Sequence, residues 1–291
     1  LKGDWDGFIR GARHGVFLFY RDYMDYHSDR FADHSLMFYK KGSLIGLLPG
    51  SVEGDTLVSH GGLTFGGVVS DFRMTVPLML DLFGRLLSYL KENRVRKLIY
   101  KAVPYIYLLA PAAEDRYALF IHNAKPIRTD ITSTIFLRNR IRFQERRERA
   151  VKKARGEKIA VKESGDYEGF MAILTDVLKK RYDVSPVHSS EELTRLARLF
   201  PQNIKLFVAE DNGRIIAGVL VYENREVAHA QYIAGNEEGR KKGALDLVFD
   251  YLINERYKDK SYFDFGISNE REGRHLNAGL MEYKESFGAR A

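Results

Sequence analysis

The sequence predicts an α/β fold, more closely α+β, built from two similar halves that each contain a mixed central sheet flanked by helices. The first observation is a repeated order of elements. A hairpin, a third strand, a glycine-rich loop, an amphipathic helix and a closing strand occur twice in 291 residues. The second observation is spacing, because the hairpin turns at Gly42 and Gly213 lie 171 residues apart. The same offset places His60 opposite Gln231, so both third strands end together, which we interpret as a divergent internal duplication.

The first half is expected to span residues 1–138. Its expected strands are Ser35–Lys40, Leu44–Leu48, Thr56–His60, Arg96–Lys101 and Ile131–Leu137. An amphipathic helix is predicted to begin near Thr75, after a glycine-rich loop that carries no Lys or Arg before Arg73. We therefore expect a neutral, aromatic-lined cleft in which His60, Gly61 and Phe65 contact the acceptor substrate. A structural histidine is the alternative for His60.

The second half is expected to span residues 159–291. An Asn-Gly turn at Asn212 joins two apolar runs, and Val227–Ala234 is predicted to be the third strand. The following loop, Gly235–Ala244, is rich in glycine and basic residues and leads into a helix whose apolar residues have helical spacing. Such a loop presents backbone N–H groups and a helix N-terminus to a phosphate. The expected diphosphate-binding residues are Gly239, Arg240, Lys241, Lys242, Gly243 and Ala244. An ordinary turn with surface lysines is the alternative.

Positive charge is concentrated between the two halves. Eleven basic and three acidic residues between Arg138 and Lys162 leave +8 in that segment, whereas the whole chain carries +7. We interpret residues 139–158 as an exposed basic connecting helix that ends near Gly156. The alternatives are contacts to nucleic-acid phosphates or to an acidic surface. Phe143 is the one aromatic residue among these charges, which disfavours base stacking.

Composition excludes several classes of site. The chain has no cysteine, which excludes disulfides, thiolate nucleophiles and Cys-type zinc sites and suits a cytoplasmic protein. No apolar run approaches the roughly 18–20 residues of a membrane helix. The eight histidines form no closely spaced pair of metal ligands, so we predict no metal.

Several segments resemble the GNAT superfamily of acyl-CoA N-acyltransferases. Arg240–Leu245 is similar to their diphosphate-binding pattern, Gln/Arg-x-x-Gly-x-Gly/Ala, at the first and fourth positions. It departs from the pattern at the sixth, where Leu245 replaces a small residue. The duplication, the strand ending in Asp264-Phe-Gly266 and the terminal Lys284-Glu-Ser-Phe-Gly288 resemble one branch, the FemAB-like proteins, which have two GNAT-like domains in tandem. This resemblance covers nearly the whole chain.

The resemblance implies that the second half binds the donor, acyl-CoA (acetyl-CoA for an acetyl group). The first half, with a degenerate cofactor loop, would lie on the acceptor side. An amine would attack the acyl carbonyl directly in a ternary complex between the domains, without a covalent intermediate. In GNAT enzymes an amide near the end of the third strand donates to the carbonyl oxygen, which here implicates Gln231 and Ile233 in donor binding.

The catalytic candidates are Tyr232, Asp264 and Lys284. The resemblance implies that Tyr232 protonates the leaving thiolate and that Lys284 lies near the donor phosphate or the oxyanion. Asp264 lies between aromatic residues, and burial there is expected to raise its pKa toward that of a general base. The alternatives are a core tyrosine, an ion pair of Asp264 with an arginine, and a solvated lysine. His229 alternates with Gln231 along the third strand and is a candidate for substrate binding, with a structural role as its alternative.

These features predict an N-acyltransferase whose acceptor is a small-molecule amine, an amino sugar or a cell-envelope precursor. The first alternative is a FemAB-type transferase that moves an amino acid from aminoacyl-tRNA to a peptidoglycan precursor. The tRNA reading is disfavoured because Val161–Asn203 lacks the long helical arm that several FemAB proteins carry. The second alternative is a non-catalytic binding scaffold, because Leu245 breaks the loop pattern.

Overall fold

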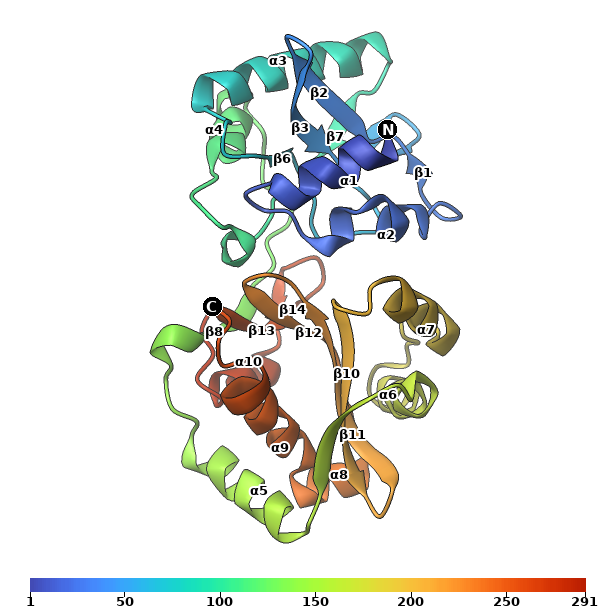
Figure 1. Ribbon diagram of the computed structural model, residues 1–291, viewed down its shortest axis with the longest axis vertical. Helices are drawn as coiled ribbons and strands as arrows, with labels where there is room; N and C mark the ends of the chain where they lie inside the picture. The colour runs from blue at the N-terminus through green and yellow to red at the C-terminus, as the bar shows by residue number, and fades with distance from the viewer. The chain divides into compact units, whose positions relative to one another are not determined.

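The computed structural model describes residues 1–291, apart from the side chain of Tyr182. The chain divides into two compact units, Leu1–Pro126 and Ile127–Ala291 (Figure 1). This boundary corrects the expected division at residue 138. The strand expected to close the first half, β8 (Thr132–Phe136), pairs instead with β13 (Tyr262–Ile267) in the sheet of the second unit.

The first unit contains short strands and four α-helices. Its strands form two sheets with the orders β1-β4-β5-β7 and β2-β3-β6. The strands are β1 (Ala32–Asp33), β2 (Leu36–Lys40), β3 (Ser43–Leu48), β4 (Ser51–Glu53), β5 (Thr56–Val58), β6 (Val69–Ser70) and β7 (Lys97–Ile99). The helices are α1 (Lys2–Gly11), α2 (Arg21–Asp25), α3 (Val76–Glu92) and α4 (Glu114–Ile121), with 3-10 turns at Phe17–Phe19 and Tyr105–Tyr107.

Helix α3 provides much of the core of the first unit. Thr75 caps it by accepting a hydrogen bond from the Leu78 N–H, which confirms the predicted start. Its predicted apolar face is buried against Leu48, Leu57 and Val68. The residues of that face are Met79, Leu82, Phe83, Leu86 and Leu90.

The second unit is built on one six-stranded sheet with the order β8-β13-β12-β11-β10-β9. The remaining strands of this sheet are β9 (Ala160–Ser164), β10 (Ile204–Asp211), β11 (Arg214–Glu223) and β12 (Val227–Gly235). The helices are α5 (Glu145–Gly156), α6 (Tyr167–Tyr182), α7 (Ser190–Leu199), α8 (Glu237–Lys242), α9 (Ala244–Tyr251) and α10 (Ala278–Glu285). A 3-10 turn (Leu137–Asn139), a π-helical turn (Leu252–Arg256) and the short pair β14 (Asn269–Glu270) and β15 (His275–Leu276) complete the unit.

Helices cover both faces of this sheet (Figure 1). Helices α6 and α7 lie on one side, and α5, α9 and α10 lie on the other. The predicted start of α7 is confirmed, because Ser189 and Glu192 form a capping box. The expectation of a separate connecting helix is wrong, because Val151 and Ala154 of α5 are buried in the same core as Val248 of α9.

The predicted duplication is visible in both hairpin turns. Lys41 and Gly42 have φ angles of 50° and 78°, and Asn212 and Gly213 have φ angles of 47° and 76°. Positive φ at both central residues identifies a type I′ turn, whose twist matches that of the flanking strands. The two turns are therefore the same structure at equivalent positions.

The pairing register of the strands also supports the duplication. In the first unit β5 pairs in parallel with β7, and the last pair is Val58 with Ile99. In the second unit β12 pairs in parallel with β13, and the last pair is His229 with Asp264. Val58 and His229 are related by the offset of 171 that relates the turns. The repeated α/β architecture that the sequence predicts, with two similar halves in tandem, is confirmed.

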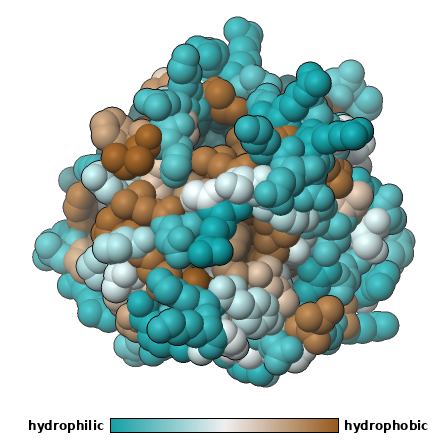
Figure 2. All heavy atoms as spheres, turned by 90° about the horizontal axis from the view of Figure 1, so that it is seen from above, coloured by the Kyte–Doolittle hydropathy of each residue, from teal (hydrophilic) through white to brown (hydrophobic). Residues whose placement is uncertain are grey.

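Some large hydrophobic side chains remain exposed in the first unit. Phe72, Tyr105 and Phe120 are 65%, 59% and 74% exposed and come from separate segments of the chain. Figure 2 shows one face of the molecule, on which hydrophobic side chains occur in several patches separated by hydrophilic ones. Scattered exposure of this kind is normal for protein surfaces. None of the described helices combines the length and apolar composition that a membrane span requires.

Candidate active site

Strands β12 and β13 separate at the centre of the second sheet. Their parallel pairing covers three residue pairs and ends with His229 and Asp264. Beyond this point β12 pairs only with β11, where the register shifts around Gln231. On the other side, the pairing of β13 with β8 is interrupted between Asp264 and Ile267, and Gly266 has a φ of 75°. The two strands thus end their pairing beside one histidine and one carboxylate.

Asp264 and His229 form a hydrogen-bonded pair at this point. Their Oδ2 and Nδ1 atoms are 2.7 Å apart. The other carboxylate oxygen, Oδ1, accepts hydrogen bonds from the Thr134 hydroxyl at 3.0 Å and from the Gly266 N–H at 3.1 Å. The side chain of Asp264 is 3% exposed and that of His229 is 17% exposed. The carboxylate is therefore fixed from three directions, and the imidazole is the member of the pair that solvent reaches.

The expected raised pKa of Asp264 is wrong. Burial by itself raises the pKa of this carboxyl, but the hydrogen bond and charge of His229, with the bonds from Gly266 and Thr134, lower it below its usual value. Asp264 is consequently ionised near neutral pH, and its partner is His229 rather than an arginine. An ionised carboxylate on Nδ1 leaves Nε2 as the nitrogen that exchanges a proton with a substrate.

Lys284 of α10 lies at the same bend of β13. Its ammonium donates to the carbonyl oxygens of Gly266 at 2.9 Å and Ile267 at 2.6 Å. The residue is 3% exposed, so the alternative of a solvated helix lysine is wrong. Burial lowers the pKa of Lys284 to about 8, although the negative charge of Asp264 opposes this shift. A lysine with such a pKa can gain or lose a proton near neutrality.

The equivalent positions of the first unit carry no such chemistry. Val58 and Ile99 occupy the places of His229 and Asp264 in the repeated register. Two aliphatic side chains cannot exchange protons, so the acid–base pair belongs to the second unit alone at this register position.

Tyr232 lies three residues beyond His229 on β12. Its hydroxyl is 2.7 Å from Nδ1 of His188, which precedes α7. Burial raises the pKa of Tyr232 to about 12. His188 and Thr134 both contact predicted site residues and were missed by the sequence analysis. Neither lies in a motif, and each is brought to its partner from more than 40 residues away in the chain.

The predicted diphosphate loop has a different structure from the one expected. Arg240, Lys241 and Lys242 form the last turn of α8 rather than a loop before a helix. Helix α8 begins earlier, at Glu237, and is capped by Asn236, whose side chain accepts the Gly239 N–H at 2.8 Å. Gly243 joins α8 to α9 with a φ of 74°.

The glycines of this segment are explained by packing. A Cβ atom on Gly239 would lie 2.3 Å from the Ile216 carbonyl oxygen, and one on Gly243 would lie 2.7 Å from that of Ala150. Both glycines are buried against protein backbone. Their small size allows α8 to approach β11 and α5, so neither glycine provides an open surface for a phosphate.

Two of the three cations are already paired with acids. Lys242 lies 2.5 Å from Asp211 and 2.9 Å from Glu238, and Lys241 lies 2.8 Å from Glu237. Arg240 is exposed. Residues 239–244 therefore do not fit the diphosphate of acyl-CoA, because their glycine faces are filled and Lys242 is held by two carboxylates. Gln231 and Ile233, the other predicted donor-binding residues, are half-buried where β12 leaves β13.

A stability measurement can separate packing from ligand binding at Gly239. Gly239→Ala is expected to lower the free energy of unfolding by about 2 kcal/mol, because the added methyl group overlaps the Ile216 carbonyl. Gly156→Ala, at the open end of α5, is the matched control and is expected to change stability little. Urea denaturation of both variants provides the measurement. Equal stabilities would contradict the packing role.

The predicted acceptor-binding residues of the first unit are buried. His60 and Phe65 are 1% and 6% exposed. Burial lowers the pKa of His60 to about 4, so its imidazole is neutral near pH 7. A Cβ atom on Gly61 would lie 2.5 Å from the Phe31 ring. This geometry favours the structural alternative for His60, leaves Phe65 buried, and directs the Cβ position of the partly exposed Gly61 at the Phe31 ring.

Most cations of the segment Arg138–Lys162 have a partner within the second unit. Arg146, Arg147 and Arg155 pair with Glu282, Asp246 and Asp250, and Arg149 pairs with Glu145. Lys153 donates to a backbone carbonyl, Arg140 contacts Asn254, and Lys162 pairs with Glu210. Between residues 138 and 162, the exposed basic residues for which the structure shows no such partner are Arg138, Arg142, Lys152 and Lys158.

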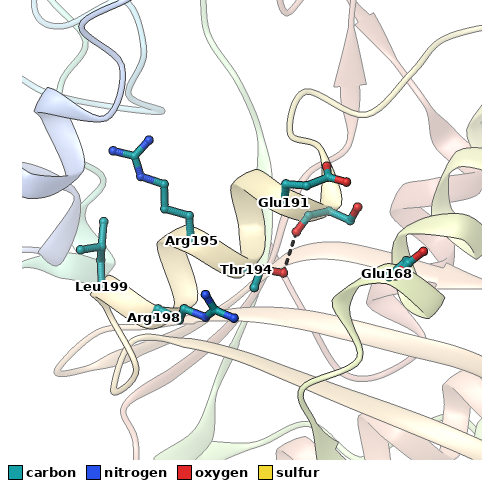
Figure 3. Close-up of a pocket in the computed structure, with 7 residues that line it drawn as sticks. Glu168, Glu191, Thr194, Arg195, Arg198 and Leu199 are labelled. Atoms are coloured by element: carbon teal, nitrogen blue, oxygen red, sulfur yellow. Dashed lines mark hydrogen bonds between the residues drawn. The ribbon is translucent and has the colours of Figure 1, made fainter.

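A cavity lies elsewhere in the second unit, between α6 and α7 (Figure 3). Its volume is about 450 Å³, and it is lined by Glu168 of α6 and by Glu191, Thr194, Arg195 and Arg198 of α7. The Thr194 hydroxyl donates a hydrogen bond to the Ser190 carbonyl (Figure 3). The residues that line this cavity include neither His229 nor Asp264. Among the described residues, no three His, Asp or Glu side chains come close enough to hold a metal ion.

Comparison with known proteins places these features in a family. The family model of an acetyltransferase (GNAT) domain matches residues 136–285, which include His229, Asp264 and Lys284. No curated protein sequence matches the chain.

Solved structures share the fold over nearly the whole length. The structure of FemX covers 100% of this chain and 93% of its own, with 11% identity and a TM-score of 0.69. A conserved protein of unknown function from Bacteroides thetaiotaomicron covers 100% and 94%, with 11% identity and a TM-score of 0.64. The C-terminal domain of a putative lysylphosphatidylglycerol synthetase from Agrobacterium fabrum covers 92% and 88%, with 10% identity and a TM-score of 0.58.

Proposed function

Because this chain belongs to the family of GNAT acetyltransferase domains and is an acyltransferase, we propose that it acylates a primary amine by direct attack on an activated acyl donor. The observation that carries this proposal is the His229–Asp264 pair at the point where β12 and β13 separate. Amide formation requires a base for the amine proton, and a histidine oriented by an ionised carboxylate is suited to that task.

His229 is the proposed general base. Its Nε2 atom accepts the proton that the amine loses as the new C–N bond forms. Asp264 holds the ring through Nδ1 and stabilises the imidazolium that results. Asp264 acts through His229 and does not itself take the proton, because its pKa is lowered in the folded protein.

Lys284 is the proposed electrostatic stabiliser and acid. An ammonium has three N–H donors, and two are used on the Gly266 and Ile267 carbonyls. The third is available to the oxyanion of the tetrahedral intermediate. With a pKa near 8, Lys284 is a better proton donor to the leaving group at neutral pH than Tyr232, whose pKa is about 12. We therefore assign Tyr232 a positioning role through His188.

Acyl-CoA remains the first donor to test, since the GNAT resemblance implies it. The misfit of residues 239–244 means that its diphosphate would have to bind elsewhere, and no step of the mechanism depends on that group. The expected acceptor is the amine of an amino sugar or of another cell-envelope precursor.

Aminoacyl-tRNA is the second candidate donor. Two observations favour it: the closed α8 segment, and the exposed basic residues at positions 138, 142, 152 and 158. An aminoacyl ester is attacked by an amine with the same proton transfers. Contacts to tRNA phosphates would make its binding weaken steeply as salt is raised.

One experiment separates these donors. The purified protein is incubated with a panel of amines and either acetyl-CoA, with release of free thiol as the readout, or aminoacyl-tRNA charged with a radiolabelled amino acid. We expect amide formation with one donor and little with Asp264→Asn. Transfer from acetyl-CoA that is unaffected by Arg240→Ala supports a diphosphate site outside α8. Absence of transfer from both donors would overturn the proposed reaction.

A further inference from the structure

Helix α10, which carries Lys284, is anchored by Arg147 of α5. The Nε atom of Arg147 donates to the Ser286 hydroxyl at 2.7 Å, and Nη1 donates to Asp246 of α9 at 2.9 Å. The guanidinium also stacks over the rings of Tyr283 and Phe287, at 4.4 Å and 5.1 Å from their centroids. Arg147 therefore contacts residues directly before and shortly after Lys284.

These contacts are protected from water. The side chains of Arg147 and Asp246 are 16% and 11% exposed, in contrast to most cations of the segment. A partly buried ion pair with additional hydrogen bonds and aromatic stacking holds its geometry better than a surface pair. The backbone before α5 adds a further tie, because the Gln144 N–H donates to the Ser286 carbonyl at 2.8 Å.

The position of Lys284 depends on these anchors. Its ammonium reaches two carbonyls at the bend of β13 only if α10 keeps its rotation and distance from the sheet. Lys284 and Ser286 are two residues apart, so a small rotation of α10 moves both. A lysine that leaves these carbonyls also becomes accessible to water.

We propose that Arg147 is a positioning residue, which clamps α10 onto α9 and so holds the Lys284 ammonium at the bend of β13. This inference rests on the proposed function for its catalytic meaning, because the clamp matters to the reaction only if Lys284 does. Arg147, the partly buried arginine of α5, would then serve the site itself rather than an external anionic partner.

Arg146 is the matched control for this proposal. Arg146 is the neighbouring arginine of α5, and it pairs with Glu282 of α10 at 2.8 Å. Its side chain and that of Glu282 are 43% and 66% exposed, and exposed pairs contribute little. Removing Arg146 therefore deletes a cation and an ion pair to α10 without removing the buried clamp.

The protonation of Lys284 reports its position directly. Burial is the larger influence on its pKa, and Asp264 of β13 is the charged group that opposes it. Loosening of α10 admits water, which raises the pKa of Lys284 toward its ordinary value of 10.5. Lysine-labelled protein is titrated by NMR, with the Lys284 signal assigned through its loss in Lys284→Met.

We expect Lys284 to titrate about one pH unit higher or more in Arg147→Ala, and unchanged in Arg146→Ala. Because Arg147→Ala leaves Asp246 without its cation and can impair folding, Ser286→Ala is the second variant. It removes one anchor on α10 and keeps the ion pair, and a smaller upward shift is expected. A folded Ser286→Ala or Arg147→Ala protein with unchanged titration of Lys284 would overturn the clamp.

The NMR readout needs no substrate, so it separates the two proposals. A shifted titration in a protein that transfers no acyl group would support the clamp and count against the proposed reaction. An unshifted titration in an active enzyme would do the reverse. In an active enzyme, the clamp also predicts that Arg147→Lys moves the pH profile of kcat with less effect on KM, a pattern that loss of stability alone does not produce.

Discussion

Replacing His229 with glutamine is expected to lower the rate of acyl transfer by a factor of about 10²–10⁴, the usual contribution of a positioned general base. Glutamine keeps a polar side chain near Asp264 but cannot take the proton of the attacking amine. Asp264→Asn is expected to cause a loss of similar size, because an amide in place of the carboxylate neither stabilises the imidazolium nor selects the correct tautomer. Steady-state kinetics with the active donor provide the measurement.

Controls separate this loss from damage to the fold. His275 is an exposed histidine of the same unit, and His275→Gln is expected to leave the rate unchanged. Tyr232→Phe is expected to cost less than His229→Gln, because the hydroxyl of Tyr232 is committed to His188. Thermal melting of each variant checks that it is folded. If a folded His229→Gln enzyme kept more than about a tenth of the rate, His229 would not be the base.

Local signals predicted the repeated architecture well. The turns at Lys41-Gly42 and Asn212-Gly213, the cap at Thr75 and the capping box at Ser189 all depend on residues close together in sequence. Such features are determined by local backbone preferences and hydrogen bonds. This is why the duplication could be identified although the two halves share little sequence.

Long-range pairing accounts for the wrong boundary. Strand β8 has an alternating pattern that fits either sheet, and its partner β13 lies about 130 residues further along the chain. Nothing local to Thr132–Phe136 indicates which sheet it joins. The pair of His229 with Asp264 has the same character, since each residue was selected separately but their contact depends on the parallel register of β12 and β13.

The error at α8 had a different origin, because the local signals were present. Asn236 is a good N-cap, Glu237 and Glu238 lie in the first turn, and each pairs with a lysine four residues later. These are typical helix-start features and favourable i, i+4 pairs. The glycines suggested a loop instead, whereas their actual role is close packing.

The buried lysine is expected to make stability depend on pH in an unusual window. The pKa of Lys284 is about 8 in the folded protein and ordinarily 10.5. Between these values the unfolded chain binds more protons than the folded one, so the free energy of unfolding rises with pH. Below pH 8 the full cost of burying the charge is present, and above pH 10.5 it is gone. The size of the change is about 3 kcal/mol.

Lys284→Met isolates this effect, because methionine has a similar length and does not titrate. The difference in unfolding free energy between the unchanged protein and Lys284→Met is expected to rise by about 3 kcal/mol between pH 7.5 and pH 10.5, measured by urea denaturation. Lys152→Met removes a solvent-exposed lysine of α5 and is expected to follow the unchanged protein throughout. A constant difference for Lys284→Met would mean that Lys284 is solvated in solution. The same variant is expected to lose acyl transfer, so a charge that destabilises the fold would be retained for the reaction.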